Sequence, residues 1–199
     1  MVMQEREEIA DLLRTLTPEQ WSTESLCRGW QVRDVVAHLL YESTPPLKYA
    51  VEILRAGGSS DRINAGYVRR GREMTIPDLI AAFETTIAGG IGSRLAPRIV
   101  LADTMIHHQD IRRPLGLARS IAPARLRMVL DHPDPFLRPG PRMRGLRFSA
   151  TDVDWHHGDG PAVRGPGEAI VLALARRSVA LDDLEGAGVQ ILRGRVSGS

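Results

Sequence analysis

The chain has 199 residues and a mass of 21.9 kDa, enough for one or two compact domains with a substantial core. Its 26 basic and 24 acidic residues nearly balance and are interspersed, which argues against a nucleic-acid-binding surface. Cys27 is the single cysteine, so an intrachain disulfide is excluded, and the charged residues 1–8 and the lack of a long apolar run argue against secretion and membrane insertion. We therefore expect a cytoplasmic protein that binds neither nucleic acid nor membranes.

Amphipathic helices are expected along most of the first 131 residues, because apolar side chains recur there at helical spacing. The breaks between these helices coincide with turn-forming pairs such as Pro45-Pro46 and Gly57-Gly58. In the second helix, His38 lies beside the apolar stripe rather than opposite to it. The predicted helices cover residues 3–16, 31–41, 47–54, 64–70, 75–87, 97–111 and 121–130.

The character of the chain changes after Asp131, where a proline-rich stretch (residues 133–141) cannot continue a helix. Apolar residues then follow a mostly alternating pattern over 146–155, and a glycine-containing turn precedes residues 162–163. We predict a small sheet there, a helix at 168–178, and a return to the sheet at 189–192. The fold class is therefore α+β, with a helical domain over 1–131 and a small α/β domain over 132–199.

Three side chains are candidates for holding a divalent metal ion. Asp103 and His107 are four residues apart on a predicted helix, so both project from one face. His38, on another helix, can supply a third ligand, as facing helices of bundles commonly do. Spacing alone leaves two other interpretations open, because a histidine beside an apolar stripe is often a hydrogen-bonded core residue. An Asp–His pair at this spacing is often a surface or capping pair.

Three stretches of the chain together resemble the mycothiol-dependent maleylpyruvate isomerase family, which belongs to the DinB-like superfamily. Residues 27–39, from Cys27 through Trp30 to His38-Leu39, are similar to the signature Cys-Pro-Gly-Trp-x-Val-x-Asp-Val-x-x-His-Leu. Residues 103–116 resemble its second signature, Glu-x-x-x-His-x-x-Asp before a Leu-Gly turn. Residues 150–189 are similar to its C-terminal region, so the resemblance covers nearly the whole chain.

The resemblance implies a DinB-like four-helix bundle that binds a metal, zinc being the leading candidate, followed by the small α/β domain. Carried over by position, the ligands are His38, His107 and Asp103, where the family has a glutamate. Aspartate is one methylene shorter, so it must approach the metal more closely or act through water. The resemblance also implies mycothiol, the low-molecular-weight thiol of actinobacteria, as cosubstrate.

The implied chemistry has a physical basis of its own. A free thiol is mostly protonated at neutral pH, whereas a thiol bound to zinc is deprotonated. The resulting thiolate can add to an electrophile, giving S-transfer. It can also add to a conjugated double bond and leave again, giving isomerisation, because the transient adduct contains a rotatable single bond. The sequence does not distinguish these outcomes.

Two residues are expected to contact substrate by the same resemblance. Asn64 stands where the family often has an asparagine, and Arg177 matches an arginine that ends its C-terminal helix motif and is suited to a carboxylate. Solvent exposure is the alternative for Arg177. Asp34 and Asp110 lie within one helical turn of His38 and His107, so either carboxylate orients a ligand histidine or serves in capping or a salt bridge.

The remaining candidates are expected to have structural roles. Cys27 precedes a helix and is expected to pack in the core, as is Trp30. His108 points away from the face of Asp103 and His107, which predicts surface exposure. His156 and His157 are adjacent in a predicted strand, so their side chains face opposite ways. One of them can reach the expected substrate cleft.

Three functions remain open at this stage. The first is a metal- and mycothiol-dependent enzyme, an S-transferase or a cis–trans isomerase, that acts on a small electrophile. The second is a metal-stabilised protein that binds or senses a small ligand without turnover. The third is metal-assisted hydrolysis by a bound water, which needs no thiol. Whether the chain forms a homodimer is also left open.

Overall fold

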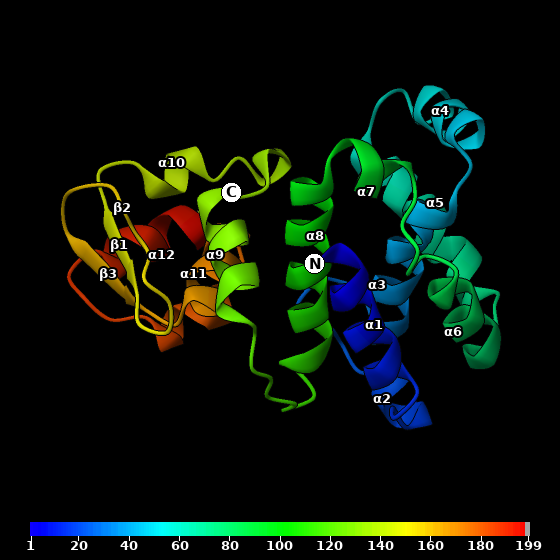
Figure 1. Cartoon of the computed structure of the whole chain (residues 1–199), viewed down its shortest axis with the longest axis horizontal. Helices are drawn as coiled ribbons and strands as arrows, with labels where there is room; N and C mark the ends of the chain where they lie inside the picture. Colours follow the sequence, from blue (N-terminus) through cyan, green and yellow to red (C-terminus); the bar gives the residue numbers. More distant parts are fainter. Residues whose placement is uncertain (198–199) are drawn as a thin grey trace. The chain divides into compact units, whose positions relative to one another are not determined.

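The computed structural model describes residues 1–197, and the chain divides into two compact units, Met1–Ala118 and Arg119–Ser199. Figure 1 colours the first unit from blue to green and the second from yellow-green to red. This division assigns the helix at Pro123–Asp131 to the second unit, whereas the sequence-based boundary after Asp131 assigned it to the first. The domain boundary after Asp131 stays a prediction.

The first unit is built from helices joined by short turns. These are α1 (Val2–Leu13), α2 (Pro18–Trp21), α3 (Val32–His38), the 3₁₀ helix η1 (Leu39–Ser43), α4 (Pro46–Arg55), α5 (Ser60–Arg72), α6 (Ile76–Glu84), α7 (Ile91–Leu95) and α8 (Pro97–Arg112).

Local sequence accounts for several helix boundaries in this unit. Thr17 caps α2, with its hydroxyl accepting from the backbone of Gln20 while the Gln20 side chain accepts from the backbone of Thr17. Thr75 caps α6 in the same way through its hydroxyl. Pro97 occupies the first turn of α8, where its missing N–H costs no hydrogen bond.

The core of the first unit lies between α1, α3, α6 and α8. Helices α1 and α3 each pack against both α6 and α8, and fully buried apolar side chains such as Ile9, Val35 and Phe83 fill the space between them. Helix α5 also packs closely on α3, because Gly71 has no side chain where it meets Ala37. A Cβ at Gly71 would lie 2.2 Å from the Cβ of Ala37. Close packing therefore fixes the position of α3, which carries His38.

The second unit combines helices with a small sheet. Its elements are α9 (Pro123–Asp131), η2 (Pro135–Leu137), α10 (Gly140–Met143), β1 (Arg147–Ala150), β2 (His156–His157), β3 (Ala162–Gly165), α11 (Gly167–Leu174), η3 (Ser178–Asp183) and α12 (Val189–Ser197).

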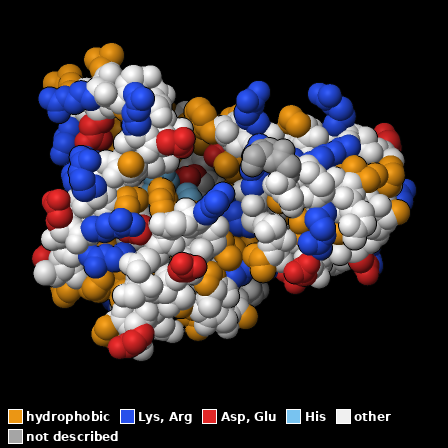
Figure 2. Space-filling view, turned by 180° about the vertical axis from the view of Figure 1, so that it is seen from behind, with side chains coloured by type: hydrophobic (Ala, Val, Ile, Leu, Met, Phe, Trp, Pro, Cys, Tyr) orange, Lys and Arg blue, Asp and Glu red, His pale blue; other side chains and the backbone are white. Residues whose placement is uncertain are grey.

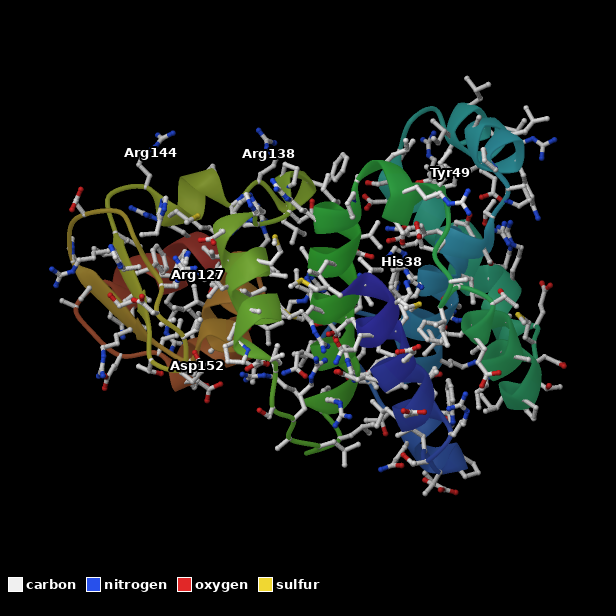
Figure 3. All side chains as sticks on the ribbon, in the orientation of Figure 1. His38, Tyr49, Arg127, Arg138, Arg144 and Asp152 are labelled. Carbon is white, nitrogen blue, oxygen red and sulfur yellow. The ribbon has the colours of Figure 1, made fainter. Side chains whose placement is uncertain are left out.

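The sheet has the strand order β2-β1-β3, with β1 antiparallel to β2 and parallel to β3. Helix α11 packs on β1 and β3 and also on α9. The buried side chains of Phe148, Val163 and Ile170 belong to this contact region. Asp152, labelled in Figure 3, accepts a hydrogen bond from the backbone of Gly167 at the start of α11 at 2.8 Å. The loop after β1 is thereby joined to the helix that covers the sheet.

The described residues confirm an α+β protein that is mostly helical with a small three-stranded sheet. One predicted strand was wrong, because residues 189–197 form the helix α12. The buried positions Val189, Leu192 and Val196 are spaced three and four residues apart, which is a helical and not a strand period. His156 and His157 do lie in a strand, but both side chains are exposed.

The surface shows no segregation of charge on the face drawn in Figure 2, where arginine and acidic side chains are intermingled. Hydrophobic side chains protrude over α4, where Leu47 and Leu54 are about four-fifths exposed, at 80% and 79%. Within residues 1–197, none of the helices combines the length and apolar character needed to cross a bilayer.

Candidate metal centre

Helices α3 and α8 bring the three predicted metal ligands together. Asp103 and His107 are one turn apart on α8, and His38 is the last residue of α3, which packs against α8. After His38 the chain tightens into η1, so the imidazole stands at a helix end rather than in the middle of a stripe. The view in Figure 3 places His38 among the helices of the first unit.

The ligand atoms face one another. Nε2 of His38 lies 3.7 Å from Oδ1 of Asp103, and Nε2 of His107 lies 3.4 Å from the same oxygen. The two imidazole rings meet edge to face with their centroids 4.8 Å apart. All three ligand atoms lie within 4.8 Å of one another. The structure therefore brings the three predicted residues together, and their role as metal ligands stays a prediction.

The donor set fits a divalent metal. Donors at about 2.0–2.1 Å in a tetrahedral site are separated by about 3.3–3.4 Å, close to the distances from Asp103 to the two histidines. His38 gives a second indication, because it is 8% exposed and its contact with Oδ1 of Asp103, at 3.7 Å from Nε2, is longer than a hydrogen bond among the described residues. Buried polar atoms without partners are unfavourable, and a metal bound to one nitrogen would remove part of that cost.

Asp110 orients the ring of His107. Its Oδ2 lies 2.8 Å from Nδ1 of His107 and accepts a second hydrogen bond from Sγ of Cys27 at 3.0 Å. With one proton held on Nδ1, Nε2 is the nitrogen that faces Asp103 and is available to a metal, which is the arrangement found in carboxylate–histidine–metal sites. Of the two roles considered for Asp110, ligand orientation is the one its contacts support.

The pKa values of the cluster follow from burial and mutual charge. Burial lowers the pKa of His38, so its ring is neutral at neutral pH. Burial also acts to lower the pKa of His107, but the electrostatic effects of Cys27 and Asp103 and the hydrogen bonds to Asp103 and Asp110 raise it well above its usual value. For Asp103, burial acts to raise the pKa, and the charge and hydrogen bonds of the two histidines outweigh this and lower it well below its usual value.

Aromatic side chains flank the cluster. The ring centroids of Trp30 and Tyr41 lie 5.5 and 5.6 Å from that of His38. The hydroxyl of Tyr41 donates a hydrogen bond to Oδ2 of Asp103 at 3.0 Å, and burial raises its pKa well above the usual value, so it remains protonated. Sequence reasoning missed Tyr41, whose position three residues after His38 was the available signal.

The two predicted substrate-contacting residues lie in different units. Asn64 is on α5, and a hydrogen-bonding effect of its side chain contributes to the pKa of His38, which indicates that it is close to the cluster. Arg177 precedes η3 in the second unit and donates to the backbone oxygen of Ala175 at 2.7 Å. Their roles toward substrate stay predictions.

Asp34 does not orient His38. Its carboxylate accepts two hydrogen bonds from Arg72, at 2.9 and 2.7 Å, and one from the backbone of Gln31 at 3.0 Å. The capping and salt-bridge role is therefore the correct one for Asp34. Cys27 is only half-buried and contacts the cluster through Asp110, so the expectation that it merely packs in the core was incomplete.

The surface position predicted for His108 was wrong. His108 is fully buried, with Nδ1 2.8 Å from Oε1 of Glu5 and Nε2 accepting from Nε of Arg112 at 2.8 Å. Glu5, Glu8 and His108 also lie close enough together to suggest a metal site. Both ring nitrogens of His108 are already engaged, however, so this group lacks the orphaned donors of His38.

The structure is that of a mostly helical α+β protein in which two histidines and one carboxylate lie close enough together that they could hold a metal ion. Residues 2–89 match the family model described as the mycothiol maleylpyruvate isomerase N-terminal domain. This match confirms the resemblance to that family that was found in the sequence. The matched region includes His38 but ends before Asp103 and His107.

Two solved structures share the fold. A histidine-to-alanine mutant of the mycothiol-dependent maleylpyruvate isomerase aligns with a TM-score of 0.63, and another structure of the mycothiol-dependent maleylpyruvate isomerase aligns with a TM-score of 0.58. In both cases the identity is 14%, and the alignment covers 94% of this chain and 90% of the other. A search among curated proteins gave no match.

Proposed function

We propose that this protein is a metal- and mycothiol-dependent enzyme that either transfers the thiol to a small electrophile or isomerises one. The single observation that carries this proposal is the convergence of His38, Asp103 and His107 from two helices, with their ligand atoms within 4.8 Å of one another. The family match and the shared fold support mycothiol as the thiol cosubstrate.

The residues of the chain have separate roles in this proposal. His38, His107 and Asp103 hold the ion, and three protein ligands are typical of catalytic zinc sites. When bound, zinc lowers the pKa of a thiol so that it is a thiolate at neutral pH. Asp110 keeps the proton of His107 on Nδ1, away from the ion. Trp30 and Tyr41 shield the ring of His38 from water.

Substrate contacts are proposed for two residues outside the ligand set. Asn64, close to His38, offers an amide that can both donate and accept hydrogen bonds. Arg177 offers a guanidinium suited to a carboxylate on the electrophile. We also propose that α1, α3, α6 and α8 correspond to the four helices of a DinB-like bundle, which their mutual packing supports.

A conjugation assay tests the proposed activity. Purified protein with zinc, mycothiol and monochlorobimane should form the fluorescent thioether, as the thiol loses its proton, a carbon–sulfur bond forms and chloride leaves. Turnover that needs both metal and mycothiol supports the proposal. Binding of mycothiol without turnover of any electrophile would favour a ligand-binding protein. Activity without thiol would favour metal-assisted hydrolysis.

Metal analysis tests the ligand set independently of the electrophile. His38→Ala and His107→Ala should both lose the ion, because each removes one of three ligands. Loss in only one of the two variants would contradict the proposed site. His108→Ala serves as a control. His108 is next to His107 on α8, but its ring contacts Glu5 and Arg112 and not the cluster, so this variant should retain the ion.

A further inference from the structure

The two carboxylate oxygens of Asp103 have different surroundings. Oδ1 faces the Nε2 atoms of His38 and His107, at 3.7 and 3.4 Å. Oδ2 accepts a hydrogen bond from the hydroxyl of Tyr41 at 3.0 Å. The direction of this bond is fixed, because an ionised carboxylate can only accept. Tyr41 therefore engages one oxygen and leaves the other directed at the two histidines.

Tyr41 is itself held in place by Arg6, which contacts its ring. The guanidinium of Arg6 lies over its ring, 5.9 Å from the centroid. Arg6 is fully buried and is anchored through Nη1 to the backbone oxygen of Leu39 at 3.3 Å and to the hydroxyl of Thr86 at 2.7 Å. A cation over an aromatic face is attractive and restricts the ring. The hydroxyl that reaches Asp103 thus comes from a well-supported side chain.

A short acidic ligand needs this support more than a long one. The aspartate side chain reaches the metal position with one methylene fewer than glutamate, so it has less freedom to adjust its distance. Partial rotation of the carboxylate about its last bond would turn the oxygen that faces the two histidines away from them. A hydrogen bond to Oδ2 opposes that rotation, as partners outside the ligand shell of metal sites commonly do.

We propose that Tyr41 is a positioning residue that fixes the orientation of the Asp103 carboxylate, so that one of its oxygens faces the metal. This inference rests on the metal site of the proposed function, but it assigns a role to a residue outside the ligand set. Tyr41 acts through Asp103 and does not itself contact the ion.

The test compares Tyr41→Phe with a matched control, Tyr67→Phe. Tyr67 is also buried, but its hydroxyl is paired with Thr44 at 2.7 Å and not with Asp103. Zinc affinity is measured by competition with a chromophoric chelator, and cobalt(II) is used to record the visible spectrum of the site. We expect Tyr41→Phe to weaken zinc binding about 10- to 100-fold and to alter the cobalt spectrum, and Tyr67→Phe to do neither.

The outcomes separate this inference from the proposed function. Wild-type protein that binds no zinc would overturn both. Wild-type binding with an unchanged Tyr41→Phe variant would overturn only the role of Tyr41. Equal loss of affinity in the Tyr41 and Tyr67 variants would also overturn it, because the effect would then be general packing. Thermal melting of the metal-free variants reports whether each one is folded.

Discussion

Replacement of Asp110 by asparagine should weaken metal binding without removing a ligand. Asp110 is fully buried, and its Oδ2 accepts from Nδ1 of His107 at 2.8 Å and from Sγ of Cys27 at 3.0 Å. Asparagine has nearly the same size but no charge, and its amide group can place a donor where Oδ2 accepted. The proton of His107 would then be favoured on Nε2, in the position where the metal must bind.

Loss of such a partner typically costs 10- to 100-fold in metal affinity, which corresponds to about 1.4–2.8 kcal/mol. Competition of the purified Asp110→Asn variant against a chromophoric chelator for zinc measures this directly. An affinity within about twofold of wild type would refute the reasoning that Asp110 orients His107, because the expected loss is at least about 10-fold.

Asp34→Asn provides the matched control. Asp34 is a second buried carboxylate, but its partners are Arg72 and the backbone of Gln31. Hydrogen bonds to a charged group are worth about 1.5–3 kcal/mol each in measured series, so this variant should unfold at lower temperature. Its zinc affinity should match wild type, because neither partner touches the ligands. The two variants thus separate loss of stability from loss of ligand orientation.

Three further predictions concern protonation and packing. Because the pKa of His107 is raised, the metal-free protein holds a proton there that metal binding must release. Zinc affinity measured by competition should therefore rise about tenfold per pH unit until the pH exceeds that raised pKa. A zinc affinity that does not change with pH would contradict His107 as a ligand. Gly71→Ala should lower the melting temperature and the free energy of unfolding by about 1–3 kcal/mol, because the new methyl group would lie 2.2 Å from the Cβ of Ala37. The control Gly66→Ala should be neutral or stabilising, because only the flexible end of an arginine side chain lies nearby, at 3.5 Å. Glu42→Gln should reduce the unfolding free energy by about 1–3 kcal/mol in denaturant titrations, because this buried carboxylate accepts backbone hydrogen bonds at the start of α7; unchanged stability would show that the charge is dispensable.

The sequence predicts the helical parts of this fold well where strong local signals exist. Pro97 and the apolar period define α8, and the four-residue spacing of Asp103 and His107 correctly predicts that they share a face. Local spacing could not connect His38 to them, because its partners are more than sixty residues away in the chain; bundle geometry and the family resemblance suggested it. Convergence of this kind is a tertiary property that no local pattern contains.

The wrong prediction for His108 has a physical cause. A helix that packs on one side only leaves its opposite face in solvent, and that assumption placed His108 outside. Helix α8 is instead buried around most of its circumference, from Val100 to Ile111. Between Val100 and Ile111 the partly exposed positions are Asp103 and His107, so the polar pair lies where this stretch of the helix is least covered. The buried His108 is accommodated by its bonds to Glu5 and Arg112.

The three proposed ligands differ in how firmly the protein holds them. His107 is fixed through Nδ1 by Asp110, and Asp103 is fixed through Oδ2 by Tyr41, so in both cases the protein engages the atom that does not face the cluster. His38 has no hydrogen-bond partner within the described residues on either nitrogen, although its ring is buried between aromatic neighbours. Two ligands are thus oriented by hydrogen bonds, whereas the third is held mainly by packing between aromatic rings. A site of this design presents a prearranged Asp–His pair on one helix, and the buried ring of His38 completes it from another, where a bound metal would offset part of the cost of burying a polar nitrogen.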